Sequence, residues 1–419
     1  MPPARVQPPS ADPRQQPAPR FGLPRPVWLL GLTSLFTDTA SEAIYPLLPI
    51  YLTRVLGAGA ASLGLIEGVA EAANSLLKIV SGRLSDRWRM RRPIVIGGYA
   101  LSSAVRPLIA LVASWEQLLA VRLFDRVGKG VRGAPRDAML AACATPETRG
   151  RVFGFHRSMD HVGAIVGPLL ASAFLLAWPG RYRWLFALTI IPGAIAVASL
   201  FLVEEPTRVD AGVGRGGGGN PDDSHAWRTL PRQLYTVLGV ILVFTLGNSA
   251  DAFLLLRLSD AGVATAAIPL LWALLHVVKA VMSTWGGIKS DRWGRRRLIG
   301  AGWLVYAIVY AGFAVSTSES ALVAWFLVYG VYYGLSEGTE RALVADLAPA
   351  TLRGTAFGLY NASLGVGSLL ASVVFGLVWK FVSPEAAFSL GAGLALAATL
   401  LLGWVRVTPP PAASGRASA

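Results

Sequence analysis

The feature that most limits the fold is a series of long apolar stretches. Two clear examples are residues 183–203 ("RWLFALTIIPGAIAVASLFLV") and residues 384–405 ("PEAAFSLGAGLALAATLLLGWV"). Each has about the 20 residues that an α-helix needs to cross the hydrocarbon core of a bilayer. Only 15% of the residues are charged, whereas a soluble domain usually has about a quarter. The sequence therefore predicts an all-α integral membrane protein.

Chain length sets the number of spans. About 355 residues remain outside the tails and the central linker, and a span with a short loop takes roughly 30. The sequence therefore predicts twelve transmembrane helices. We expect them at residues 27–55, 62–81, 93–114, 116–142, 151–178, 182–203, 231–257, 263–285, 297–316, 319–346, 352–381 and 384–405.

The distribution of arginine predicts the orientation. The formal net charge is +14, but the arginines are neither interleaved with aromatic residues nor gathered in a soluble region, which argues against nucleic-acid binding. They lie in alternate loops, such as those after the second and eighth predicted helices. The positive-inside rule therefore predicts a multi-pass protein of the cytoplasmic (inner) membrane with both termini in the cytoplasm.

Composition divides the chain into five parts. Residues 1–26 are rich in proline and arginine and lack the apolar core of a secretory signal, so we expect a disordered cytoplasmic tail. A Gly-rich cytoplasmic linker at 206–230 separates two six-helix bundles, predicted at 27–205 and 231–406. We expect a second disordered tail at 407–419.

The two bundles contain related sequences. "SGRLSDRWRMRR" aligns with "GGIKSDRWGRRR", and "RGRVFGFHRS" aligns with "RGTAFGLYNAS". Both matches occur at a shift of about 205 residues, and two matches at one period indicate an internal duplication.

Twelve predicted helices in two related halves, with "G-x-x-x-D-R-x-x-R-R" after helices 2 and 8, resemble the major facilitator superfamily of secondary transporters. The resemblance covers residues 27 to about 406 and implies the major facilitator fold, with alternating access between two pseudo-symmetric six-helix bundles. It also implies a latch of ion pairs at the cytoplasmic helix ends. The same arginines could act only as topology signals, but the repeated Asp and Gly favour the latch. The matching latch residues are Gly82, Asp86, Arg87, Arg91 and Arg92, then Gly287, Asp291, Arg292, Arg295 and Arg296.

A second resemblance concerns the fifth helix. "GAIVGP" matches the Gly-x-x-x-Gly-Pro core of a motif associated with exporters of the superfamily, through Gly163, Gly167 and Pro168. The motif is incomplete, because "LLAS" follows where the family pattern has a Gly pair. Small residues four apart let helices approach closely, which suits a gate between halves. Other segments, such as "DTASEAIYPLLPIYL", resemble a prokaryotic subgroup of the family, but that resemblance implies no substrate.

Ionisable residues inside the spans are the main functional candidates, since a charge in the bilayer is costly unless it faces a cavity or a partner. Asp38, Glu42 and Tyr45 recur at i, i+4 and i+7, which places them on one stripe. Asp38 and Glu67 lack an opposite charge at helical spacing, so a proton could bind and leave as the cavity switches sides. Internal salt bridges are the alternative, and we expect them for Glu71, Lys78, Asp125, Arg126, Glu340 and Arg341. The proton-coupling candidates are Asp38, Glu67, Glu42, His156 and Asp160; the last two could instead cap a helix end.

The second half has fewer charges in its spans and more aromatic residues, which predicts an aromatic and neutral polar wall. The expected substrate-cavity residues are Tyr45, Arg106, Arg122, Asp251, Trp272, His276, Tyr333, Glu337 and Asn361. A single cysteine and four histidines favour neither a disulfide nor a metal site. We expect no cofactor.

These features predict a transporter rather than an enzyme, since no P-loop or nucleophile–base pair is evident. A proton-coupled exporter of a small organic solute fits best, with the protein a monomer in the bilayer. A proton-coupled importer of a nutrient or siderophore, and a non-transporting sensor or scaffold, remain alternatives. The sequence leaves open the substrate, the direction, H⁺ or Na⁺ as the coupling ion, and the oligomeric state.

Overall fold

The computed structural model describes residues 23–88, 91–144, 148–204, 226–349 and 352–405. Within them the ordered elements are helical and form twelve membrane-spanning segments, which confirms the predicted fold class. Seven of the described spans are long and apolar enough on their own to cross a membrane.

The first six segments are α1 (Arg25–Ile44) continued by η3 (Tyr45–Leu47), α2 (Leu48–Ile50) and η4 (Tyr51–Val55); α3 (Ala60–Trp88); α4 (Arg91–Val105) with η5 (Arg106–Leu111); α5 (Trp115–Ala142); α6 (Arg149–Ala177); and α7 (Tyr182–Leu188) with α8 (Ile190–Phe201). After a short η6 (Ala226–Thr229), the last six are α9 (Arg232–Gly247) with α10 (Ala252–Asp260); α11 (Ala267–Trp293); α12 (Arg295–Val315); α13 (Glu319–Leu347); α14 (Arg353–Phe381); and α15 (Pro384–Trp404).

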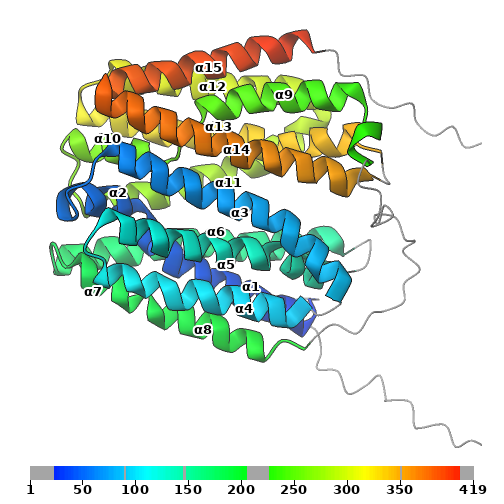
Figure 1. Ribbon diagram of the computed structural model, residues 1–419, viewed down its shortest axis with the longest axis horizontal. Helices are drawn as coiled ribbons and strands as arrows, with labels where there is room; N and C mark the ends of the chain where they lie inside the picture. Colours follow the sequence, from blue (N-terminus) through cyan, green and yellow to red (C-terminus); the bar gives the residue numbers. More distant parts are fainter. Residues whose placement is uncertain (1–22, 89–90, 145–147, 205–225, 350–351, 406–419) are drawn as a thin grey trace, which may run out of the picture.

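The segments form two bundles of six (Figure 1). In the first, α1 packs on α6 and α8, while α3 and α4 pack on α5; in the second, α11 and α12 pack on α13, and α9 and α15 pack together. The bundles meet along α3 with α14 and along α6 with α11. In Figure 1, α3 and α14 separate towards the end of the molecule where α3 ends and α14 begins.

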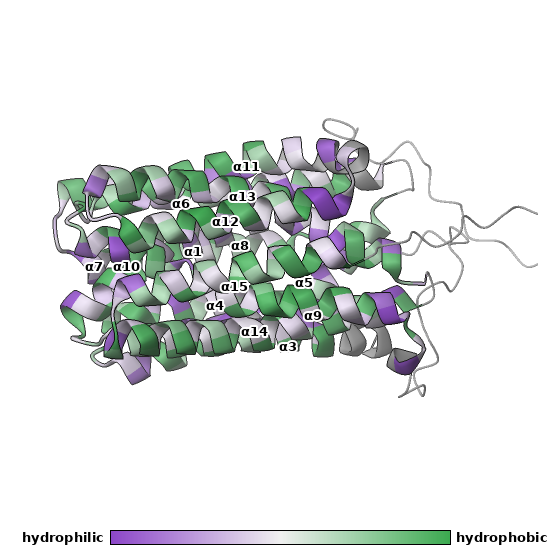
Figure 2. Cartoon of the chain, turned by 90° about the horizontal axis from the view of Figure 1, so that it is seen from above, coloured by the Kyte–Doolittle hydropathy of each residue, from purple (hydrophilic) through white to green (hydrophobic). Residues whose placement is uncertain are grey.

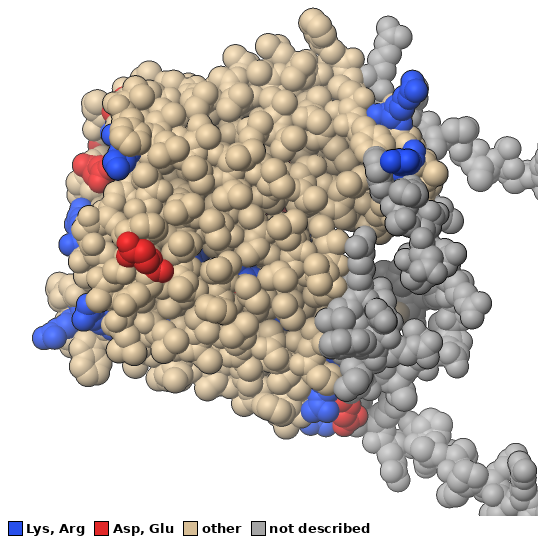
Figure 3. Space-filling model, in the orientation of Figure 1, with Lys and Arg blue, Asp and Glu red and all other residues tan. Residues whose placement is uncertain are grey.

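The outer surface suits a bilayer. Apolar residues follow the helices along most of their length, and hydrophilic residues gather towards the two ends (Figure 2). On the face in Figure 3, charged side chains lie mainly at the two ends of the molecule, and a wide band of mostly uncharged residues lies between them. Large apolar side chains such as Leu176, Trp184, Phe201, Val315 and Trp404 are exposed on the outside. This surface can contact lipid without burying charge.

Two helices are longer than the apolar pattern predicts. We expected loops after residues 81 and 285, but α3 continues to Trp88 and α11 to Trp293. The polar "D-R-W" sequences are thus helical, because a helix that leaves the hydrocarbon needs no apolar residues to continue in the polar region. Gly294, with φ of 85°, ends α11 in a conformation that side chains other than glycine rarely adopt.

The seventh span is broken, although the sequence predicts a continuous helix over 231–257. Helix α9 ends at Gly247 and α10 begins at Ala252. The Tyr306 hydroxyl donates to the Gly247 carbonyl at 2.9 Å, and the Asn248 side-chain amide donates to the Tyr332 hydroxyl at 2.9 Å. A hydroxyl on a neighbouring helix thus satisfies the backbone carbonyl at the end of α9, as the membrane interior requires.

Candidate functional site

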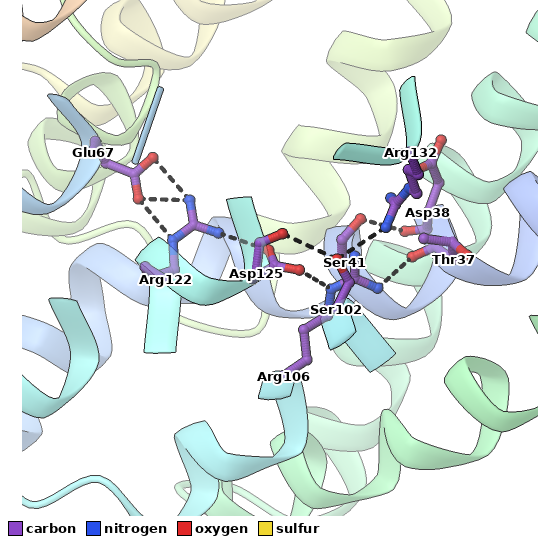
Figure 4. Close-up of polar contacts among 9 residues, drawn as sticks. All are labelled: Thr37, Asp38, Ser41, Glu67, Ser102, Arg106, Arg122, Asp125 and Arg132. Atoms are coloured by element: carbon purple, nitrogen blue, oxygen red, sulfur yellow. Dashed lines mark hydrogen bonds and ion pairs between the residues drawn. The ribbon is translucent and has the colours of Figure 1, made fainter. Parts of the chain in front are cut away.

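Four buried charged residues of alternating sign form a chain inside the first half (Figure 4). Arg122 of α5 donates to both carboxylate oxygens of Glu67 of α3, at 2.7 and 2.9 Å from Nη2. Arg122 Nη1 also lies 3.8 Å from Asp125 Oδ2, and Arg106 Nε donates to Asp125 Oδ1 at 2.9 Å. The four side chains are at most 6% exposed. We call this set the Glu67–Arg106 chain; it confirms the expected salt bridge of Asp125.

Further hydrogen bonds fix this chain to neighbouring helices. Arg106 Nη1 donates to the Thr37 carbonyl of α1 at 3.0 Å, and Ser102 Oγ donates to the Asp125 carbonyl at 3.0 Å. Arg132 donates to Ser102 Oγ at 2.9 Å. Because each buried charge has an opposite partner, the chain is paired and hydrogen-bonded as buried ions must be.

Asp38 of α1 has a different environment. Its side chain is partly exposed, and no hydrogen bond of its carboxylate is recorded within the described residues. The charged groups that act on it most strongly are Asp160, Lys129, Glu42 and Arg132, a mixture of both signs. Asp38 is therefore a partly exposed residue among charges of both signs.

The predicted gate glycines lie directly against this part of α1. A methyl group added at Gly163 would come within 3.0 Å of Asp38 Cβ and 3.1 Å of the Thr39 nitrogen. One added at Gly167 would come within 2.9 Å of the Ala43 nitrogen. Gly163 and Gly167 thus allow α6 to contact the backbone of α1 beside Asp38.

His156 and Asp160 lie on the same helix and face α1. His156 Nδ1 is 3.6 Å from Asp160 Oδ2, and the Ser34 hydroxyl of α1 donates to Asp160. The neighbouring Arg157 crosses to the second half, where its guanidinium is 3.4 Å from Glu337 Oε1. Asp160 therefore holds α6 to α1, and Arg157 links the two halves.

Among the described residues of the second half, a buried ion pair lies among tyrosines at the break of the seventh span. Lys279 Nζ of α11 lies 3.2 Å from Asp251 Oδ2. The Tyr329 hydroxyl of α13 donates to Asp251 Oδ1 at 2.7 Å, and the Tyr333 hydroxyl is 3.4 Å from both carboxylate oxygens. The Lys279 ammonium lies 3.7 Å from the centre of the Tyr333 ring, which is cation–π distance.

The two halves also meet through α1 and α11. Trp272 Nε1 donates to Glu42 Oε2 at 2.9 Å, and the Tyr45 and Trp272 rings are 5.1 Å apart. His276 Nε2 is 4.0 Å from the same Glu42 oxygen. Four expected coupling and cavity residues are thus brought to one place: Glu42, Tyr45, Trp272 and His276. Lys279, the partner of Asp251, lies one turn further along α11.

Some expectations differ from the structure. We expected a salt bridge for Glu340, but within the described residues it accepts hydrogen bonds from Trp303 Nε1 at 2.9 Å and the Tyr360 hydroxyl at 3.3 Å. The ion pair was expected because Arg341 is the next residue in the sequence. Arg341 Nη2 instead lies 3.3 Å from Glu337 Oε1, because Glu337 is one turn away on the same helix face. Asn361 donates to the Phe357 carbonyl of its own helix.

Sequence reasoning missed Lys129. Lys129 belongs to a row of basic residues on one face of α5 at spacings of three and four: Arg122, Arg126, Lys129, Arg132 and Arg136. That periodicity was available in the sequence. The sequence placed Tyr329 on a stripe with Tyr333 and Glu337, but it could not give the partner Asp251, which lies on another span.

The expected latch is only partly described. The structure does not describe the surroundings of six of the latch residues: Gly82, Asp86, Arg87, Gly287, Asp291 and Arg292. Arg91 donates to the Ala138 carbonyl and Arg92 to the Phe201 carbonyl, both in the first half. Arg295 contacts Asp346 and Arg296 the Val405 carbonyl, both in the second. These recorded contacts tie neighbouring helices within each half. The described residues also contain no group of three His, Cys, Asp or Glu that could hold a metal ion.

Two six-helix bundles with charged residues turned inward define the class of a polytopic membrane transporter. The profile described as "Major Facilitator Superfamily" matches residues 30–288 and 236–419, and the chain belongs to that superfamily. The chain is 34% identical over 391 residues to an uncharacterised MFS-type transporter of Methanocaldococcus jannaschii, which covers 91% of this chain and 94% of the relative.

Two further similarities are more limited. A multidrug resistance protein, MdtH, of Aeromonas hydrophila is 27% identical over 193 residues, 45% of this chain and 48% of that protein. The solved structure of the nucleoside transporter NupG superposes with a TM-score of 0.73 at 14% identity, over 90% of this chain and 98% of that one. The latter similarity supports the fold alone.

Proposed function

We propose that this protein is a proton-coupled secondary transporter that exports a small organic solute across the cytoplasmic membrane by alternating access. The observation that carries this proposal is the contrast between Asp38 and Glu67. Glu67 is held by Arg122 in a bidentate ion pair, so protonating it would break several hydrogen bonds to a charged group. Asp38 is partly exposed, and no hydrogen bond of its carboxylate is recorded in the described residues. Asp38 can therefore exchange a proton at a much smaller cost.

The contacts between halves support alternating access. Arg54 of η4 donates to the Ser259 hydroxyl at 2.9 Å, and Ser172 of α6 donates to the Ala266 carbonyl at 2.7 Å. Arg54 follows α1 at the end opposite Arg25, and Ser172 lies near the end of α6 opposite Arg149. The arginine distribution predicts that Arg25 and Arg149 lie towards the cytoplasm, so the proposal puts both bridges on the extracellular side, as in an inward-facing state.

Helix α6 gives the proposal its coupling route. Gly163 and Gly167 touch the backbone of α1 on either side of Thr39, so a tilt of α6 must move the surroundings of Asp38. Asp160, one turn earlier on α6, is among the charges that act on Asp38. A change in the distance between these two carboxylates changes their repulsion, and with it the proton affinity of Asp38. The resemblance of this segment to an exporter motif favours outward transport.

The test compares Asp38→Asn with a matched control, Glu340→Gln, in proteoliposomes that contain a pH-sensitive dye. A panel of solutes is added, and solute-dependent proton movement is recorded. We expect the protein and Glu340→Gln to move protons with at least one solute, and Asp38→Asn to bind that solute without proton movement. Full proton coupling in Asp38→Asn would contradict the proposal.

Direction requires a separate measurement. Cells that express the protein should accumulate less of the solute than cells that express Asp38→Asn. Greater accumulation would instead indicate the importer. Solute binding without any flux, in the presence of a proton gradient, would indicate the sensor or scaffold.

A further inference from the structure

The Lys279 ammonium has hydrogen-bonding capacity that its surroundings do not use. An ammonium carries three N–H donors, and the oxygen acceptor recorded for Lys279 is Asp251 Oδ2 at 3.2 Å. Its other close neighbours are rings, with centres 3.7 Å away for Tyr333 and 5.0 Å for Trp272. These rings attract the positive charge but are not conventional acceptors. Within the described residues, a residue only 8% exposed thus keeps donors that point at no recorded oxygen or nitrogen acceptor.

Its partner Asp251 is better satisfied. Besides Lys279, the Asp251 carboxylate accepts from the Tyr329 hydroxyl at 2.7 Å and lies 3.4 Å from the Tyr333 hydroxyl. If Lys279 turned to a new acceptor, Asp251 would keep these hydroxyl donors. If a foreign cation took Asp251, Lys279 would be left as a buried charge among rings, which is costly. This asymmetry favours an incoming anion over an incoming cation.

His276 supplies a second unsatisfied group one turn before Lys279. Both of its ring nitrogens are buried and have no hydrogen-bond partner in the described structure. The nearest recorded carboxylate oxygen, Glu42 Oε2, is 4.0 Å away and already accepts from Trp272 Nε1. Trp272, His276 and Lys279 are spaced i, i+4 and i+7, so they share one face of α11.

Aromatic rings from both halves surround this face. The Tyr45 ring of α1 lies 5.1 Å from the Trp272 ring, and the Trp272 ring lies 5.1 Å from the imidazole of His276. On the α13 side, the Tyr333 ring covers the Lys279 ammonium. An apolar or aromatic body could pack here with its acidic end towards α11, as ligand sites commonly combine apolar walls with a few polar groups.

We infer that Lys279 and His276 bind the acidic group of the transported solute, so that the substrate class is an organic acid with an aromatic or apolar body. The inference rests on the proposed function, since it names the substrate of the transport path. Binding requires Lys279 to exchange Asp251 for the substrate carboxylate. Asp251 then stays with Tyr329 and Tyr333.

The test uses the purified full-length protein and two series of compounds that differ only in the polar group. The first series is 3-phenylpropionate, 3-phenylpropanamide and 3-phenylpropylamine; the second is indole-3-acetate, indole-3-acetamide and tryptamine. Binding is measured by thermal stabilisation and calorimetry without a gradient. We expect each acid to bind about ten-fold or more tightly than its amide and amine, since a hydrogen bond to a charged group has that magnitude.

The decisive variant is the double substitution Lys279→Gln with Asp251→Asn. It removes both charges together, so neither is left buried alone if the single variant fails to fold. We expect it to weaken acid binding about ten- to a hundred-fold and to leave the weak binding of the amides unchanged. Lys380→Gln, at the far end of α14, is the control for the loss of a positive charge and should bind like the unmodified protein.

Three results would overturn the inference. The first is an amine or amide that binds as tightly as its acid, and the second is unchanged acid binding in the double variant. The third is no binding of either acid at a ligand concentration of about 10 mM, at which a Kd near 1 mM is readily detected. Failure of the proposed function gives a different result. In that case the acids bind, but the Asp38→Asn comparison shows no coupled proton movement.

Discussion

The two halves share a fold but stabilise their buried carboxylates in different ways. In the first half, Glu67 and Asp125 are paired with arginines. In the second half, Glu340 accepts hydrogen bonds from Trp303 and Tyr360. Asp251 accepts a hydrogen bond from Tyr329 and forms an ion pair with Lys279. The first interior therefore relies on opposite charges, and the second on aromatic side chains that carry hydrogen-bond donors.

This difference lies in the partners of the buried charges. In the Glu67–Arg106 chain each charge has an opposite partner, and the set joins α3, α5 and η5 and reaches the Thr37 carbonyl of α1. Rings with single polar atoms make a surface that an organic solute can contact. The proposed function assigns the proton to the first half and the solute to the second.

The sharpest test of this comparison removes Arg122. Arg122→Met leaves Glu67 buried without its partner, which should lower the free energy of unfolding by about 3 to 5 kcal/mol. The measurement is thermal unfolding of the purified protein in detergent. The double variant Glu67→Gln with Arg122→Met removes both charges and should recover most of the loss. A single variant as stable as the unmodified protein would show that ion pairing does not hold the first half.

The corresponding change in the second half removes one hydroxyl. Tyr329→Phe deletes the 2.7 Å hydrogen bond to Asp251 and should lower stability by about 1.5 to 3 kcal/mol, as for other hydrogen bonds to charged groups. Tyr333→Phe is the matched control, since its hydroxyl lies at 3.4 Å from the carboxylate and contributes less. Equal losses in the two variants, again measured by thermal unfolding, would contradict the assignment of Tyr329 as the main donor.

Much of this architecture could be predicted from sequence because hydropathy and charge distribution act locally. Apolar length predicted the twelve spans, and the shortage of charge in the later spans predicted an aromatic second half. The break before Ala252 could not be predicted, since Tyr306 and Tyr332, which bond to the Gly247 carbonyl and the Asn248 side chain, lie on other helices. The sequence offered several arginines as partners of Glu67, but it could not select Arg122, which is 55 residues away along the chain.

The close contact of α1 with α6 gives a prediction of intermediate size. Gly163→Ala places a methyl group against the α1 backbone at Leu35 and Thr39, and the required shift should lower stability by about 1 to 3 kcal/mol. Gly154→Ala on the same helix meets nothing within 4 Å and should be neutral or slightly stabilising, because alanine favours helix. If both variants unfold at the same temperature, the two helices are not in backbone contact. The parallel pair in the second half is Gly334→Ala against Gly338→Ala.

The smallest effect is expected at the exposed ion pair between the two halves. Arg157 is 55% exposed and lies 3.4 Å from Glu337, which also has Arg341 at 3.3 Å. Arg157→Gln should therefore lower stability by at most about 1 kcal/mol, because solvent screens the pair and Glu337 retains a partner. The difference should disappear at high salt, which a comparison of unfolding temperatures at low and high ionic strength can show. A loss of stability as large as that of Arg122→Met, independent of salt, would contradict this prediction. It would mean that ion pairs join the two halves as strongly as they hold the first half together. The contrast between the two interiors would then no longer hold.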